Sequence, residues 1–160
     1  MLLIADFLRK LFFEHYLIEK RITFARILEK NEFMKRCKIL IVDDIPTNVT
    51  LISTIIKKKL DAYSDTALSG EEALKKVESF NPDIIILDLM MPGVDGWDVI
   101  RNVRSKHGKD EVAIIVTSAI TDEVNMAECY DLGVNDYIEK PILQNKLLNT
   151  IRRQAEKILG

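Results

Sequence analysis

The sequence has little of what a disulfide framework, a metal-binding cysteine cluster or an export signal requires. Only two of the 160 residues are cysteine, Cys37 and Cys129, and they have no metal-ligand spacing. Two isolated thiols are typical of a reduced, cytosolic protein. Asp6, Arg9 and Lys10 interrupt the apolar start of the chain, whereas a membrane span needs roughly 20 apolar residues and a signal peptide carries its positive charge first. We therefore expect a cytoplasmic protein without a membrane span.

The chain also lacks a strong excess of charge of either sign. Its net charge of -2 gives no reason to expect direct nucleic-acid binding, and 48% hydrophobic with 30% charged residues suits a packed globular core. The charge is unevenly spread, however. Residues 1–36 hold eight basic and five acidic residues, whereas residues 37–160 hold fifteen basic and twenty acidic ones. Because the pattern of apolar residues also changes at Cys37, we place a domain boundary between residues 36 and 37.

Residues 1–36 contain no proline or glycine and have a helical pattern. Apolar residues follow alternating steps of four and three, with His15 as the one polar member of the series: Ile4, Leu8, Leu11, His15, Ile18, Ile22 and Ala25. One interpretation is a helix that packs on a second copy, giving a homodimer, or on the adjacent domain. The other is a basic amphipathic helix at a membrane surface. The acidic residues mixed through the segment favour packing.

From Cys37 onward, short apolar runs alternate with helical patterns. The expected strands are 38–42, 62–66, 84–87, 112–116 and 136–139, and the second of these is the weakest. Continuous apolar runs are typical of strands buried on both faces, which indicates a parallel sheet covered by helices.

Helix signals fill the intervals between these strands. Pro46 stands where a first helical turn tolerates proline, and Ser69 with Glu72 has the spacing of a capping box. Asn81-Pro82 then ends that helix. Further helices are expected over 96–104, 123–132 and 144–159. The sequence thus predicts an α/β fold, a (βα)5 doubly wound sheet of five parallel strands with an N-terminal helical extension.

The carboxyl ends of the predicted strands carry an unusual set of side chains. Asp43 and Asp44 follow the first strand, Asp88 the third, Ser118 the fourth and Lys140 the fifth. In a doubly wound parallel sheet these ends share one edge, where sites form. A single aspartate there is usually a helix cap or a solvated loop residue. Three carboxylates repel one another unless a cation neutralises them, and Mg²⁺ prefers such oxygen ligands.

This combination suits phosphoryl transfer. A carboxylate can act as a nucleophile and form an aspartyl phosphate. An ammonium group and a hydroxyl can contact the remaining phosphoryl oxygens.

Residues 37–160 resemble the response-regulator receiver family. The matching segments are KILIVDD, DIIILDLMMPGVDGWDVI, VTSA and LGVNDYIEKPI, together with the terminal amphipathic helix. The separations of 44 residues from Asp44 to Asp88, 30 from Asp88 to Ser118 and 22 from Ser118 to Lys140 also match. The resemblance implies the flavodoxin-like receiver fold and a phosphorylation switch.

The family's site residues can be placed on this sequence. Asp88 matches the phosphoacceptor, and Asp44 matches the direct Mg²⁺ ligand with Asp43 assisting. The backbone carbonyl of Met90 matches the third protein ligand. Lys140 matches the lysine that contacts the phosphate.

The resemblance also implies a switch. Ser118 matches the switch hydroxyl and Tyr137 the switch aromatic, and the bond from Lys140 to Pro141 is expected to be cis. Thr117 is a second hydroxyl beside Ser118, and the separations from Asp88 and Lys140 favour Ser118.

The expected function is to accept a phosphoryl group from a sensor histidine kinase or a histidine phosphotransfer protein. Phosphorylation then changes a surface, around residues 123–159, that binds an output protein. Such a domain catalyses its own phosphorylation and dephosphorylation but is no enzyme for a diffusible metabolite.

Alternatives remain open. The VDDIPTNV segment is similar to receivers found in hybrid kinases and in regulators joined to diguanylate cyclase domains. The chain could therefore be the input part of a longer regulator. An aspartyl-phosphate phosphohydrolase is a rival enzyme. Met34 offers a later start, which would leave residues 1–33 outside the functional protein.

Overall fold

The computed structural model describes residues 12–23, 34–120 and 122–160. The chain divides into two units, Met1–Phe33 and Met34–Gly160, and each is described by itself. The division falls three residues before the boundary expected from the sequence. Met34 is buried, and its carbonyl accepts a hydrogen bond of 3.1 Å from the backbone N–H of Cys37. Met34 therefore belongs to the larger unit.

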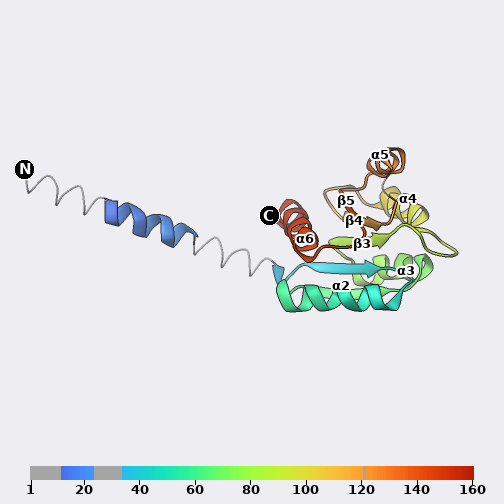
Figure 1. The fold of residues 1–160 in the computed structure, drawn as a ribbon, viewed down its shortest axis with the longest axis horizontal. Helices are drawn as coiled ribbons and strands as arrows, with labels where there is room; N and C mark the ends of the chain where they lie inside the picture. Colours follow the sequence, from blue (N-terminus) through green and yellow to red (C-terminus); the bar gives the residue numbers. More distant parts are fainter. Residues whose placement is uncertain (1–11, 24–33, 121) are drawn as a thin grey trace, which may run out of the picture. The chain divides into compact units, whose positions relative to one another are not determined.

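The larger unit is built on one sheet of five parallel strands (Figure 1). The strands are β1 (Lys38–Val42), β2 (Tyr63–Ala67), β3 (Ile84–Asp88), β4 (Ala113–Ser118) and β5 (Asp136–Glu139), and their order across the sheet is β2-β1-β3-β4-β5. Every residue of β3 and β4 is buried. This explains their continuous apolar sequences, since helices cover both faces of a doubly wound sheet.

Five helices of the larger unit alternate with the strands: α2 (Pro46–Lys59), α3 (Gly70–Phe80), α4 (Gly96–Lys106), α5 (Glu123–Asp131) and α6 (Gln144–Leu159). Side chains of α3, α4 and α5 share one core with alternate residues of the strands, while α2 and α6 contact each other and the sheet. The predicted (βα)5 fold is therefore confirmed.

The ends of α3 follow the sequence signals. The Ser69 hydroxyl accepts a hydrogen bond of 3.2 Å from the Glu72 N–H, and the Glu72 carboxylate accepts one of 2.9 Å from the Leu68 N–H. This reciprocal capping box satisfies backbone donors that the helix leaves unpaired. Asn81 ends α3 in the left-handed conformation, with φ of 50°. Cys37 and Cys129 are both buried and free.

Residues 12–23 form a helix whose residues are all exposed. Its large apolar residues are Phe12, Phe13, Tyr16, Leu17, Ile18 and Ile22. The other members of the predicted apolar series, at positions 4, 8, 11 and 25, lie outside the described residues. Of the helices that the structure describes, none has the length and apolar character needed to cross a membrane.

Candidate functional site

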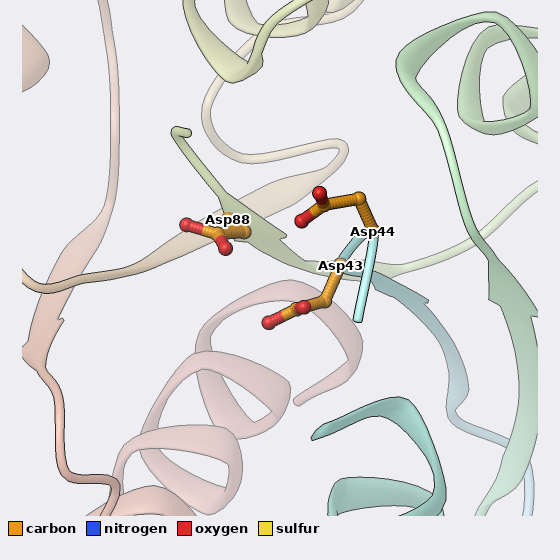
Figure 2. A group of neighbouring side chains, drawn as sticks. All are labelled: Asp43, Asp44 and Asp88. Carbon is orange, nitrogen blue, oxygen red and sulfur yellow. The ribbon is translucent and has the colours of Figure 1, made fainter. Parts of the chain in front are cut away.

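Three carboxylates meet at the carboxyl edge of the sheet. Asp43 and Asp44 directly follow β1, and Asp88 is the last residue of β3, the strand that pairs with β1. Figure 2 shows the three side chains leaving these two strand ends. One oxygen from each lies within 4.8 Å of the others, with Asp43 and Asp88 buried and Asp44 half-buried. The predicted acidic cluster is thus formed by neighbouring strands of a parallel sheet.

Lys140 bridges two of these carboxylates. Its Nζ donates a hydrogen bond of 2.7 Å to Asp88 Oδ2 and another of 2.9 Å to Asp43 Oδ2. Lys140 immediately follows β5, and the bond between Lys140 and Pro141 is cis, as expected. The ammonium group therefore balances one of the negative charges gathered at this edge.

Both oxygens of the Asp43 carboxylate accept hydrogen bonds. Oδ1 accepts from the Ile45 N–H at 2.9 Å and from Asn48 Nδ2 at 3.1 Å, and Oδ2 accepts from Asn48 Nδ2 at 3.0 Å as well as from Lys140. Sequence reasoning missed Asn48, although its place in the first turn of α2, after Pro46, allows it to reach back to Asp43. Among the described residues no hydrogen bond engages the Asp44 carboxylate, so Asp44 is the carboxylate available to a ligand.

Asp88 lies in an environment that opposes its ionisation. The residue is 4% exposed, and burial raises the pKa of its carboxyl, although the hydrogen bond and charge of Lys140 and the Met90 N–H act in the opposite direction. The Met90 N–H donates to Asp88 Oδ1 at 3.2 Å. Burial also acts to lower the pKa of Lys140, but its hydrogen bonds to Asp88 and Asp43 outweigh burial and raise that pKa. Lys140 therefore stays protonated and holds Asp88 as its partner.

Ser118 and Tyr137 meet at Ile120. The Ser118 hydroxyl accepts a hydrogen bond of 3.1 Å from the Ile120 N–H, and the Tyr137 hydroxyl donates one of 2.5 Å to the Ile120 carbonyl. Ser118 is fully buried and Tyr137 is 7% exposed. The two predicted switch residues are thus linked through one backbone unit of the loop after β4.

Thr117 and Ser118 face opposite sides of the sheet because side chains alternate along a strand. Thr117 pairs with Asp88 across β3 and β4. Its hydroxyl is buried and lacks a hydrogen-bond partner among the described residues. Ser118 accepts a backbone hydrogen bond of 2.8 Å from Lys140 through its carbonyl. This hydrogen bond therefore fixes the position of the Lys140 backbone beside the end of β4.

The donor set suits a hard divalent cation. Three carboxylates and one ammonium leave a net negative charge, and carboxylate oxygens are the ligands that Mg²⁺ prefers. The half-buried Asp44 gives a ligand access from solvent. Met90 is anchored beside Asp88 by its amide and is 63% exposed. This arrangement can bind a cation and present a carboxylate to an incoming phosphoryl group.

Comparisons with known proteins agree with this geometry. The model of the response regulator receiver domain matches residues 39–152. The hybrid signal transduction histidine kinase L of Dictyostelium discoideum is 34% identical over 125 residues, which cover 74% of this chain and 7% of that protein. The DNA-binding response regulator MtrA of Mycolicibacterium smegmatis is 33% identical over 124 residues, which cover 76% of this chain and 52% of that protein. The chain therefore spans about half of MtrA and a small part of the kinase.

Among solved structures, the chemotaxis protein CheY4 of Vibrio cholerae is 27% identical with a TM-score of 0.69, and the match covers 74% of this chain and 98% of CheY4. The residues matched by the family model, 39–152, lie within the unit that contains the sheet and the acidic edge. The chain therefore belongs to the response regulator receiver domain family.

Proposed function

We propose that this chain is a phosphorylation switch that accepts a phosphoryl group on Asp88 in a Mg²⁺-dependent reaction. The donor is a sensor histidine kinase or a histidine phosphotransfer protein, and the reaction takes place in the cytoplasm. The observation that carries the proposal is the bridge from Lys140 to Asp88 and Asp43, beside the accessible carboxylate of Asp44. A structural ion pair alone would not require a third carboxylate at the same edge.

The proposed Mg²⁺ ligands are the carboxylates of Asp43, Asp44 and Asp88 and the backbone carbonyl of Met90. Asp44 binds directly, and Asp43 assists because its oxygens are already engaged. When bound, the ion supplies positive charge that balances the carboxylates and the phosphoryl oxygens.

The residues of the chain carry the transfer itself. An oxygen of the ionised Asp88 carboxylate attacks the phosphorus, the phosphorus–nitrogen bond to the donor histidine breaks, and the nitrogen keeps the electron pair. Lys140 holds Asp88 in place beforehand and can contact a phosphoryl oxygen afterwards, since its ammonium group has three donors. Burial of Asp88 excludes water from the attacking oxygen.

Phosphorylation then changes a protein-binding surface through Ser118 and Tyr137. A phosphoryl oxygen on Asp88 gives the Ser118 hydroxyl a new acceptor, which draws the loop at Ile120 inward. Tyr137 follows because its hydroxyl is bonded to the same loop. The outcome is a two-state change in the surface around α5, β5 and α6 that an output protein recognises.

Under this proposal the domain catalyses only its own phosphorylation and dephosphorylation. The alternative of an aspartyl-phosphate phosphohydrolase requires turnover of a free phosphate ester, so multiple turnovers of p-nitrophenyl phosphate would favour it. A second candidate keeps the same chemistry and makes the chain the input part of a longer regulator. It is favoured by the match to about half of MtrA, and sequencing of the full transcript tests it.

The deciding experiment is phosphorylation by acetyl phosphate or by a histidine kinase with Mg²⁺, followed by mass spectrometry. Asp88→Asn should abolish the labelling because the nucleophile is removed. The control Asp110→Asn changes an exposed aspartate just before β4, at the opposite end of that strand from Ser118, and should be labelled normally. Full labelling of Asp88→Asn would show that another residue accepts the phosphoryl group and would contradict the proposal.

A further inference from the structure

The loop over residues 89–95 lies directly against the backbone of the proposed acceptor. The Gly96 N–H donates a hydrogen bond of 3.0 Å to the Leu89 carbonyl. A Cβ atom added at Gly96 would lie 2.4 Å from the carbonyl oxygen of Asp88, so only glycine fits there. Met90, near the start of the loop, is bonded to the Asp88 side chain. Any shift of the loop would therefore move Met90 relative to Asp88.

The far side of the same loop packs on the N-terminus of α3. A Cβ atom added at Gly70 would lie 2.1 Å from the carbonyl oxygen of Val94 and 2.7 Å from its Cγ1. Gly70 has no positive φ, so the glycine serves close approach and not an unusual backbone conformation. The Val94 N–H also donates a hydrogen bond of 3.4 Å to Glu71 Oε1. Two consecutive residues of α3 thus contact Val94: Gly70 leaves room for its carbonyl oxygen, and the Glu71 carboxylate accepts from its N–H.

The N-terminus of α3 is itself well fixed. The reciprocal capping bonds between Ser69, Glu72 and Leu68 close the first turn, and Gly70 is buried. A capped helix start is a rigid support, because the capping hydrogen bonds pair backbone N–H groups that the helix would otherwise leave free. The loop is therefore held between this support and the acceptor strand.

Glu71 is suited to its contact with Val94. The hydrogen bonds from its own backbone N–H, from the Ser69 hydroxyl and from the Val94 N–H hold the pKa of the Glu71 carboxyl below its usual range. The carboxylate is consequently ionised at neutral pH, and a charged acceptor forms stronger hydrogen bonds than a neutral one.

We propose that Gly70 and Glu71 are positioning residues for the phosphoacceptor site: Gly70 lets Val94 approach and Glu71 bonds its N–H, a clamp that holds the loop in the place from which Met90 and Asp88 can bind Mg²⁺. This inference rests on the proposed function, because it assigns residues of α3 to the same site. Neither residue touches the three carboxylates in the described contacts. Their effect passes through the backbone of the loop.

The test compares the wild-type chain with Glu71→Ala, Glu71→Gln and the control Glu78→Ala. Glu78 is an exposed acidic residue of α3, seven positions after Glu71, and it pairs with Lys106 of α4. Two quantities are measured: the Mg²⁺ dissociation constant from Trp97 fluorescence, and amide hydrogen exchange of residues 89–95 in the metal-free protein. Glu71→Ala should bind Mg²⁺ about threefold more weakly, the effect of losing one hydrogen bond.

Exchange in the loop should also be faster in Glu71→Ala, while Glu71→Gln should recover part of both effects because its amide oxygen can still accept from Val94. Glu78→Ala should match the wild type. Gly70→Ala should weaken Mg²⁺ binding more than Glu71→Ala does, since the added Cβ atom displaces a backbone oxygen. If Gly70→Ala does not fold, the two Glu71 variants decide the question.

Wild-type Mg²⁺ affinity and loop exchange in Glu71→Ala would overturn the inference while leaving the proposed function intact. Failure of the wild-type chain to bind Mg²⁺ would instead contradict the proposed function. In that case, unchanged loop exchange in Glu71→Ala would still refute the clamp, and faster exchange would support it.

Discussion

Lys140 and Asp88 are 52 positions apart in the chain, and the ammonium nitrogen of the first lies 2.7 Å from a carboxylate oxygen of the second. The same nitrogen reaches Asp43 at 2.9 Å. One positive charge therefore serves two buried carboxylates, with a third carboxylate from Asp44 close by. Because one ammonium group faces three carboxylates, we expect the metal-free site to carry a net negative charge that destabilises the folded protein.

We predict that Asp88→Asn stabilises the metal-free protein at pH 7. Burial raises the pKa of Asp88, so the folded state binds this proton more tightly than the unfolded state does. The ionised Asp88 carboxylate therefore destabilises the folded state most at pH values above its pKa in the folded protein. This destabilisation disappears as the pH falls to the usual pKa of an aspartate. The melting temperature should rise by roughly 2–6 °C, the shift expected for about 1 kcal/mol in a domain of this size.

The stability difference should narrow as the pH is lowered, because wild-type Asp88 then becomes protonated. Calorimetry between neutral and acidic pH measures it, with Asp110→Asn as the control that should melt like the wild type. A lower melting temperature for Asp88→Asn at pH 7 would show that the bond to Lys140 outweighs the cost of burying the carboxylate.

Replacement of Asp43 and replacement of Asp44 should have different effects on Mg²⁺ binding and on the free energy of unfolding. Asp44→Ala should weaken Mg²⁺ binding without loss of stability, since no hydrogen bond among the described residues engages this carboxylate. Asp43→Ala leaves the Ile45 N–H, Asn48 and Lys140 without their acceptor, and should cost about 2–4 kcal/mol of unfolding free energy.

Mg²⁺ titration of Trp97 fluorescence and urea unfolding measure the two effects separately. Equal and unchanged Mg²⁺ affinities in Asp43→Ala and Asp44→Ala would remove the case for a metal site at this edge.

The grouping of the charged side chains could be predicted from the sequence because it depends on where strands end. Asp88 and Lys140 each lie at or just after the end of a strand, and parallel strands end at one edge. Asn48, Glu71 and Gly70 could not be predicted in the same way. They lie on α2 and α3, and their contacts depend on how closely each helix packs against a loop, which periodicity does not specify.

Ser118→Ala should still accept a phosphoryl group but lose most of the structural response. Its hydroxyl is the group that can bond a phosphoryl oxygen, and the loop that it contacts at Ile120 also bonds Tyr137. Amide exchange over residues 119–139, with and without the phosphoryl mimic beryllium fluoride, measures the response. We expect a clear change in the wild type and a change at least about threefold smaller in Ser118→Ala, as for the loss of one hydrogen bond.

Tyr137→Phe is a useful companion variant because it removes only the hydroxyl that bonds the Ile120 carbonyl. It should show an intermediate response. A full beryllium fluoride response in Ser118→Ala would mean that the signal leaves Asp88 by a route that does not involve this hydroxyl.

Removal of residues 1–33 should lower the oligomeric mass of the protein in solution. The helix over 12–23 exposes Phe12, Phe13 and Ile18 among other large apolar residues, and a surface of this kind favours association. Light scattering of the full chain and of a chain beginning at Met34 measures the effect. If the helix packs on the receiver instead, the shorter chain should melt at a lower temperature; equal mass and equal melting would leave this helix without a structural role.

The phosphorylated state should be long-lived because the two residues whose amides bond Asp88 and Ser118 have apolar side chains. Hydrolysis needs a water molecule placed in line with the bond that breaks. Met90 is bonded through its amide to the Asp88 carboxylate, and Ile120 is bonded through its amide to the Ser118 hydroxyl. The backbone of each residue is therefore held close to the position that the phosphoryl group would take. Neither can orient a water by hydrogen bonding, and both can hinder its approach.

Replacing both residues by polar ones should therefore shorten the lifetime. The double variant Met90→Asn with Ile120→Glu should lose its phosphoryl group about tenfold faster, which corresponds to roughly 1.4 kcal/mol of improved water alignment. The decay is followed after donor removal with Mg²⁺ present, with Val124→Asn, a change of an exposed apolar residue on α5, as the control. A double variant that decays at the wild-type rate or more slowly would show that these two side chains do not govern the access of water, and that the lifetime depends on the charges around Asp88 instead.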